Sequence, residues 1–280
     1  MVEVYDQIQF RKETIAEFEQ SMSCFRVSAS GSYAEERVVS GSKATILVGG
    51  TGNASATQRG RDGEIPARKN NRIPRVVTLK EFNDLVHETE FDSFAAQGNG
   101  IALMQSGVVK VINRAIDDSI IEALDSSTTI YPGAATSTPN NELISDVLKT
   151  LDRADIDTSE QDKMFAAVTP KTWRVLETIP EFASKDYTDV AYYEGPSAKY
   201  RKWRGLNWFK SNRLPGVGTA TEKNFIYHRD ALAFAPNSDD MMVFNGHNEE
   251  QGYYWARATI FMGATVLQNS GIVTFRTDDS

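Results

Sequence analysis

The chain contains a long polar segment that cannot form a core of its own. Residues 49–75 read GGTGNASATQRGRDGEIPARKNNRIPR and hold two large apolar side chains, Ile65 and Ile73, against five glycines. A short β-type run stands on each side, residues 44–48 (ATILV) and residues 76–79 (VVTL). This pattern predicts a hairpin whose ends pair and whose tip extends away from any core. A polar loop of this length inside a core-rich chain is usually functional or disordered.

The same segment is basic, although the chain as a whole is acidic. Between Arg59 and Arg75, six cations and two anions give a balance of +4, while the whole chain carries −8, which leaves −12 for the remainder. The six cations are Arg59, Arg61, Arg68, Lys69, Arg72 and Arg75. This charge separation suggests that the basic arm contacts an acidic surface, such as another copy of the same chain.

Length and composition exclude several broad classes. A chain of 280 residues can bury roughly three quarters of its unfolded surface, in one domain or two. A pI near 5.1 argues against general nucleic-acid binding, because phosphate neutralisation needs an accessible basic surface. The single cysteine, Cys24, excludes an intramolecular disulfide, and no secretory signal precedes it.

Residues 258–275 carry no charge and approach the length of a transmembrane helix. A turn signal, Gln268-Asn-Ser-Gly271, interrupts them, and their flanks are rich in Thr, Val, Ile and Phe. We therefore expect two paired strands here and no membrane span.

The strongest helical pattern covers residues 101–125. Its apolar positions are Ile101, Met104, Val108, Ile112, Ala115, Ile116, Ile120 and Leu124. This spacing of three and four residues predicts one amphipathic helix of about 37 Å, long enough to be a spine to which other parts attach.

The remaining pattern is mixed. We expect helices over 13–25, over 141–153 with Asn140 or Asn141 as its cap, and from Pro170 to about Ile179. We also expect strands at 164–168, 206–209, 225–227, 241–244, 253–267 and 272–275. Residues 27–43 and 126–141 have the composition of linkers, 81–91 form a mixed segment, and 181–202 are irregular.

No catalytic motif is present. His87, His228 and His247 are far apart and lack metal-ligand spacing. His247-Asn-Glu-Glu250 is interpreted as a solvated turn, and Gly216-Val-Gly218 lacks the third glycine of a dinucleotide site. Cys24 lies on the apolar side of a predicted helix, which favours burial over nucleophilic chemistry. The sequence thus predicts no catalytic, cofactor-binding or metal site, and no enzyme.

Several stretches resemble the major capsid proteins of tailed bacteriophages, and one podovirus-like group in particular. They are Phe10-Arg-Lys-Glu-Thr14, Ile65-Pro-Ala-Arg68, Val111-Ile-Asn-Arg-Ala-Ile-Asp-Asp118, Arg213-Leu-Pro-Gly-Val-Gly-Thr219, Glu249-Glu-Gln-Gly-Tyr-Tyr-Trp-Ala-Arg257, Phe261-Met-Gly263 and Leu267-Gln-Asn-Ser-Gly-Ile-Val273. The resemblance spans nearly the whole chain, both in the order of these stretches and in their residues.

The resemblance implies an α+β fold, the tailed-phage major capsid protein fold. Carried over, residues 1–40 are an N-terminal arm and 41–78 an extended loop, the β-hairpin arm. Residues 79–133 and 240–280 form a peripheral domain with the spine helix at about 101–125. Residues 134–239 form an axial domain.

The implied function is that of a coat protein that self-assembles into the icosahedral capsid of a virion. Such a shell is built of pentamers and hexamers and encloses double-stranded DNA without sequence-specific binding. A separate scaffolding protein and a portal are implied partners, and a decoration protein is left open. The implied location is the virion capsid, assembled in the bacterial host cytoplasm, with no cofactor and no membrane partner.

Two other functions stay open at this point. One is another self-associating phage structural protein, such as a tail-tube component, and the other is an enzyme with an unrecognised site. For the basic arm, we expect contacts with carboxylates of a neighbouring subunit. The candidate receivers are Asp117, Asp118 and Glu122 on the spine helix, and Glu81, Asp84, Glu88 and Glu90 before it.

Overall fold

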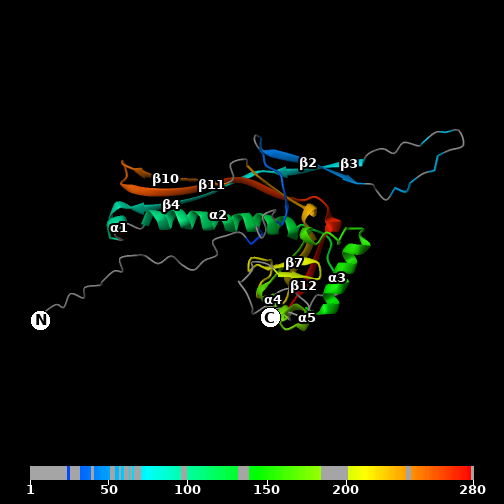
Figure 1. Cartoon of the computed structure of the whole chain (residues 1–280). Helices are drawn as coiled ribbons and strands as arrows, with labels where there is room; N and C mark the ends of the chain where they lie inside the picture. The colour runs from blue at the N-terminus through cyan, green and yellow to red at the C-terminus, as the bar shows by residue number, and fades with distance from the viewer. Residues whose placement is uncertain are drawn as a thin grey trace.

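The computed structural model shows an elongated body with an arm that extends from it (Figure 1). The described residues are 24–25, 32–38, 41–50, 54–56, 58–59, 63, 65, 71–95, 100–131, 139–183, 201–237 and 241–278. One long helix runs along the body, a sheet covers one side of it, and a compact α/β lobe lies at its C-terminal end (Figure 1). No helix in the described part is long and apolar enough to cross a membrane.

The long helix, α2, spans Gly100–Asp125 and confirms the helix predicted over 101–125. Its apolar residues recur every three or four positions, so they form one stripe along the helix. The buried residues of this stripe include Met104, Val108, Ile112, Ile116, Ile120 and Leu124. They share one core with residues of the body and of the lobe, so α2 is the element on which both are built.

The sheet beside α2, here called the body sheet, has five strands. They are β1 (Ala34–Glu35), β4 (Lys80–Thr89), β9 (Leu232–Pro236), β10 (Met242–Asn248) and β11 (Tyr253–Val266). The long strand β11 pairs antiparallel with β10 and β4 over its first part and with β9 over its second part. Side chains alternate across a strand, so Ala256, Ala258, Ile260 and Met262 together enter the α2 core.

Strand β4 and the short helix α1 (Glu90–Ala95) replace the mixed segment predicted at 81–91. Asn83, Asp84 and Glu88 are poor strand formers, which hid this strand in the sequence. It forms because β11 offers a continuous pairing edge, from Met262 opposite Lys80 to Tyr253 opposite Thr89. Tertiary pairing has therefore overridden local propensity.

The lobe contains a second five-stranded sheet, here called the lobe sheet, in the order β12-β8-β5-β7-β6. Its strands are β5 (Met164–Val168), β6 (Arg201–Trp203), β7 (Leu206–Lys210), β8 (Glu222–His228) and β12 (Ile272–Thr277). Its α-helices are α3 (Asn141–Arg153), α4 (Pro170–Glu177) and α5 (Pro180–Ala183). Short 3₁₀ turns lie at Gln161–Lys163, Arg229–Ala231 and Asn269–Gly271.

Both faces of the lobe sheet are covered, and its central strand β5 is apolar throughout. On one face, Phe165, Ala167 and Phe209 join the core around α2. On the other face, Ala166 and Trp208 pack in a second core that contains residues of α3, α4 and α5. The alternation of neighbouring residues between two cores joins the lobe firmly to the body.

Local signals placed two helix starts correctly. Asn140 caps α3, because its side-chain oxygen accepts a hydrogen bond from the Leu143 N–H at 2.7 Å. Pro170 is the first residue of α4, with Thr169 as the cap. The helix ends at Glu177 rather than near Ile179, and α5 begins at Pro180.

The expectation of two paired strands within 258–275 was wrong in one respect. Both strands exist, but β11 belongs to the body sheet and β12 to the lobe sheet, and they do not pair. The turn at Asn269–Gly271 is therefore a crossing between sheets, not the end of a hairpin. Strand β9, which the sequence did not reveal, crosses in the other direction, so strand pairing passes the predicted boundaries at 134–239 and 240–280 twice.

Some predictions lie outside the described residues. The helix predicted over 13–25 is represented only by Cys24 and Phe25, and most of the irregular segment 181–202 is also not described. The strand predictions at 206–209, 225–227, 241–244, 253–267 and 272–275 are confirmed with shifts of a few residues at their ends.

Candidate intersubunit surfaces

The basic segment is carried by a two-stranded hairpin, as the sequence predicted. Strand β2 (Lys43–Gly50) pairs antiparallel with β3 (Asn71–Thr78), and this pair forms a sheet of its own. Only its root packs on the body: Val77 is buried, and Arg75 Nε donates to the Leu267 carbonyl at 3.2 Å. The other residues of β2 and β3 lead away from the body sheet (Figure 1).

The arm exposes apolar side chains that the described residues of its own subunit cover only in part. Leu47 is 58% exposed, Ile73 46% and Val76 49%, and Ile65 nearer the tip reaches 71%. Among its cations, Arg72 is exposed, and Arg59 Nε donates to the Gly63 carbonyl at 2.8 Å. Arg61, Arg68 and Lys69 lie outside the described residues.

The three predicted receivers on α2 have different surroundings. Asp117 is buried, and its carboxylate accepts hydrogen bonds from the backbone N–H groups of Cys24 at 2.9 Å and Phe25 at 3.4 Å. Asp118 is on the surface but holds Arg213 of the lobe through two hydrogen bonds of 2.7 and 2.5 Å. Asp117 is thus not on the surface that a neighbour can meet, and Asp118 is already paired within the subunit.

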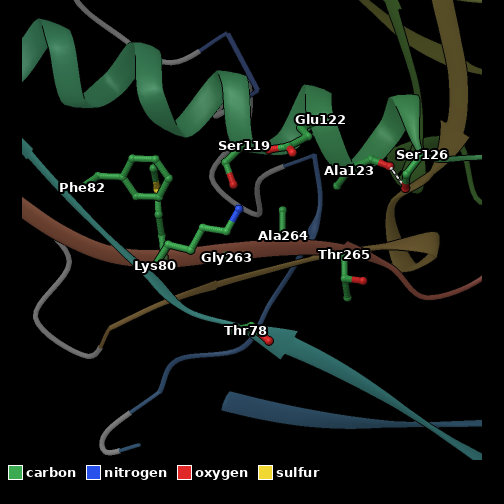
Figure 2. A pocket seen from close by; sticks show the side chains of 11 residues that line it. Thr78, Lys80, Phe82, Ser119, Glu122, Ala123, Ser126, Gly263, Ala264 and Thr265 are labelled. Atoms are coloured by element: carbon green, nitrogen blue, oxygen red, sulfur yellow. Dashed lines mark hydrogen bonds between the residues drawn. The ribbon is translucent and has the colours of Figure 1, made fainter. Parts of the chain in front are cut away.

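Glu122, the third receiver, is exposed and borders a cavity of about 230 Å³ at the root of the arm. The cavity lies between α2 and the starting point of β4. Figure 2 shows Lys80 extending into it toward the part of α2 that carries Ser119 and Glu122. Thr78, the last residue of β3, also lines this cavity, so the site adjoins the place where the arm leaves the body.

The carboxylates before α2 are spread along β4 to the far tip of the body. Glu81 accepts a hydrogen bond from the Asn83 amide at 2.9 Å, and Asp84 is half-buried. Glu88 lies against Gly100, where a Cβ would meet its carboxylate. Glu90 contacts His247 Nε2 at 2.8 Å.

Sequence reasoning missed the apolar side chains at this tip. Phe91 is 76% exposed and Phe94 82%, both on α1. On β10 and β4, Phe244 is 45% exposed and Leu85 49%, and the Arg257 guanidinium lies over the Phe244 ring at 5.4 Å. The three-residue spacing of Phe91 and Phe94 is visible in the sequence, but the sequence could not show that the described residues leave both rings uncovered.

The lobe is tied to α2 by two ion pairs that the sequence did not predict. Arg213 binds Asp118, and Lys223 Nζ bonds to Asp125 Oδ1. Hydrogen bonding to Asp118 raises the pKa of the Arg213 guanidinium above its usual value. Asp118 and Asp125 lie seven residues apart, and therefore on one side of the helix about 10 Å from each other.

The groups that suggested chemistry in the sequence are dispersed. The His87 ring packs on Tyr253, His228 Nδ1 accepts a hydrogen bond from the Asp230 N–H, and His247 pairs with Glu90. Gly216 has φ +79° and a Cβ there would meet the Thr221 carbonyl, so this glycine makes a tight turn. Within the described ranges, no three metal-ligating side chains gather.

The sequence was compared with models of known protein families. A family model described as phage capsid protein matches residues 31–279. A search of curated protein sequences found no match.

Solved structures share the fold at low sequence identity. A structure from Mycobacterium phage Che8 aligns with a TM-score of 0.73 and 15% identity over 98% of each chain. The capsid of cyanophage P-SCSP1u aligns with a TM-score of 0.68 and 12% identity, over 97% of this chain and 93% of that one. The holo-SrpI encapsulin complex from Synechococcus elongatus PCC 7942 aligns with 0.65 and 12%, over 98% and 94%.

Proposed function

The chain belongs to the phage capsid protein family and is a major capsid protein, and from this premise we propose how its copies assemble. Pentamers and hexamers of the chain close into an icosahedral shell around a double-stranded DNA genome. The observation that carries this proposal is the family match over residues 31–279. The arm, the spine helix α2 and the lobe offer the parts that such a shell needs.

The closed shell requires contacts that a single subunit does not satisfy. The described arm leaves Leu47, Ile73 and Val76 about half exposed. At the opposite end of the body, α1 leaves Phe91 and Phe94 almost fully exposed (Figure 1). Exposed apolar groups of this kind mark surfaces that other molecules cover. Repeated head-to-tail contacts close into rings when the rotation between copies permits it.

Negative-stain imaging and sedimentation of purified protein test the proposal. We expect hollow particles of uniform diameter when the chain is produced with its scaffolding protein. Open tubes would assign the chain to a tail-tube component instead. A strictly monomeric species at high concentration, with the scaffold present, would contradict a shell-forming role.

The role is structural, without catalytic turnover. The three histidines lie in separate local contacts, and none of these contacts joins a histidine to a serine, threonine or cysteine side chain. A hydrolase, kinase or oxidoreductase activity that co-purifies with the protein and is abolished by a point substitution in this chain would overturn this part of the proposal.

The basic arm docks on an acidic surface of a neighbouring subunit. Asp117 is buried and Asp118 holds Arg213, so the available carboxylates are Glu122 and those of β4 and α1. Each exposed pair contributes only ~0.2–1 kcal/mol, but several pairs per arm act together in every copy of a shell.

Charge reversal tests the arm. Replacing Arg68, Lys69 and Arg72 together by Glu should weaken assembly at physiological salt. The variant Glu122→Lys in the same background should restore part of it if Glu122 receives the arm. Limited proteolysis should cut residues 49–75 in free subunits and spare them in particles. Equal cleavage in both states would mean that the arm is not a clamp between subunits.

The remaining partners are proposals from the family. A separate scaffolding protein guides assembly, a portal occupies one vertex, and the shell assembles in the bacterial cytoplasm. Co-purification of particles from host cells, with and without the candidate scaffolding gene, distinguishes a chain that closes alone from one that needs this partner.

A further inference from the structure

Two adjacent carboxylates on α2 hold segments that are far apart in the sequence. Asp117 accepts hydrogen bonds from the N–H groups of Cys24 and Phe25. Asp118, the next residue, accepts hydrogen bonds from Nε and Nη2 of Arg213 at 2.7 and 2.5 Å. Consecutive helical positions point about 100° apart, so this junction connects α2 to two different segments at one level.

The N-terminal segment is seated deeply at this junction. The Phe25 side chain is fully buried, and its ring meets that of Phe209 edge to face at 5.1 Å. The Ser32 hydroxyl donates to the Phe25 carbonyl at 2.6 Å, and Arg229 Nε donates to the Tyr33 carbonyl at 3.2 Å. The residues that follow continue as β1, in parallel pairing with β9. We call Cys24, Phe25 and Ser32–Val38 the N-terminal anchor.

The same short stretch of the lobe touches the anchor and α2. Phe209 lies near the end of β7, and Arg213 follows three residues after the strand ends at Lys210. Phe25 is thus packed against the same stretch that carries Arg213, whose side chain binds α2. Removing Phe25 would take one aromatic side chain out of the core between α2 and the lobe sheet.

We propose that the N-terminal anchor is a wedge that couples the chain's N-terminal end to the position of the lobe on α2. A partner that binds residues 1–23 and pulls on them would displace Phe25 from its buried position. The packing of the lobe on α2 would then be loosened. Coupling free energies are reciprocal, so a displaced lobe must also loosen the anchor. This inference rests on contacts inside one subunit and does not depend on the assembly proposed above.

Cys24 supplies a native reporter, because it is the single cysteine of the chain and is half-buried beside the junction. In the full-length free subunit, the rate of thiol modification by a maleimide measures how often the anchor opens. We expect Arg213→Gln to raise this rate by about fivefold or more, the scale of ordinary coupling between sites. Arg174→Gln is the matched control, because it breaks an ion pair to Glu177 within α4 that does not connect the lobe to α2, and its rate should stay within about twofold.

The direct electrostatic effect of Arg213 has the opposite sign. Removing a nearby cation disfavours the thiolate, which is the reactive form, and so would slow the modification. An acceleration must therefore come from opening of the anchor. A wild-type rate in Arg213→Gln, or an equal acceleration in the control Arg174→Gln, would overturn the proposal.

Hydrogen exchange tests the coupling in the reverse direction, from the anchor to the lobe. Asp117→Asn should raise hydrogen exchange by about fivefold in the loop 211–221 and at the end of β7, as well as in the anchor. Glu122→Gln, a similar change elsewhere on α2, should leave both regions at the wild-type rate. Faster exchange confined to the anchor would mean that opening of the anchor does not change the lobe, and would overturn the proposed coupling.

Discussion

At the scale of single residues, the lobe contains a buried carboxyl group that bonds only to neutral donors among the contacts described for it. Glu222 is fully buried, and its oxygens accept hydrogen bonds from the Thr169 hydroxyl at 2.7 Å, the Gly218 N–H at 3.2 Å and the Thr277 hydroxyl at 3.3 Å. It therefore joins the start of β8 to the N-terminus of α4, to β12 and to the loop 211–221. Such a network is stabilising only while every member keeps its partner.

The substitution Glu222→Gln should lower the free energy of unfolding by about 2 kcal/mol, because an amide NH₂ then faces a donor that the carboxyl oxygen had accepted. Denaturant unfolding of the free subunit measures this difference. Glu250→Gln on an exposed turn is the matched control and should change stability by less than about 0.5 kcal/mol. Equal losses in the two variants would contradict the importance of the network.

Tyr227 provides a second test at this scale. Its side chain is fully buried, its hydroxyl has no hydrogen-bond partner among the described residues, and burial raises its pKa well above the usual value. In the unfolded chain the phenol ionises near pH 10, whereas in the folded chain it stays neutral. Stability is therefore intact below about pH 10 and falls as the pH rises further, by up to about 1.4 kcal/mol per pH unit.

Tyr227→Phe should remove this part of the pH dependence. We expect the variant to be as stable as the wild type at pH 7, because the lost hydroxyl has no described partner. Above pH 10 the wild type should lose stability faster than the variant. Unfolding curves measured at pH 7, 10 and 11 check the result. An equal loss of stability in both proteins above pH 10 would show that Tyr227 does not cause it.

Residue types alone could not assign the carboxylates of α2. The sequence predicted Asp117, Asp118 and Glu122 as equivalent receivers for the arm, because all three are acidic and neighbouring. The structure separates them: Asp117 is buried under the N-terminal anchor, Asp118 binds Arg213, and Glu122 is exposed. The distinction depends on segments more than ninety positions away, which no local pattern contains.

At the scale of elements, helix caps were the most readable local signal. The sequence left Asn140 and Asn141 as alternatives, and the structure assigns the cap of α3 to Asn140. Asn141 instead accepts a hydrogen bond from Arg204 at 2.8 Å. The two neighbours therefore have different roles that a substitution can separate.

Asn140→Ala should lower the free energy of unfolding by about 1 kcal/mol, because the Leu143 N–H loses its partner. Asn140→Asp keeps an acceptor at the cap and should remain within about 0.5 kcal/mol of the wild type. Thermal or denaturant unfolding compares the three proteins. Identical stability of the alanine variant would mean that water replaces the cap at no cost.

Strands were predictable where their own residues are apolar, and unpredictable where a partner makes them. Buried strand β5 consists of five apolar residues and was found, as was the long strand β11. Strand β4 carries Asn, Asp and Glu, and it becomes a strand because β11 pairs with it. The separation of β11 and β12 into two sheets depends on where β8 and β9 lie, which is information about the whole chain.

At the scale of the whole molecule, charge is separated between the arm and the body. The stretch from Arg59 to Arg75 carries +4, and the rest of the chain carries −12. The arm's strands β2 and β3 lead away from the body that bears these carboxylates (Figure 1). We therefore expect the attraction between these opposite charges to act between copies of the chain.

Assembly should therefore weaken as salt rises. The contacts involve exposed groups, and the screening length falls from about 10 Å at 0.1 M to about 3 Å at 1 M ionic strength. We expect the concentration of subunits needed for assembly, measured by sedimentation, to increase steadily between about 0.05 and 0.5 M NaCl. If the contacts were made only by apolar side chains such as Phe91 and Phe94, this concentration would fall or stay constant as NaCl rises.

The neutralised variant Arg59→Gln, Arg61→Gln, Arg72→Gln locates the source of this dependence. If the arm supplies the attraction, the variant should need more protein to assemble at low salt and should respond less to added salt than the wild type. Because glutamine retains much of the length of arginine, apolar contacts of the arm are largely preserved. An unchanged salt slope in the variant would place the attraction elsewhere on the subunit, and the basic arm would then be a solvated surface.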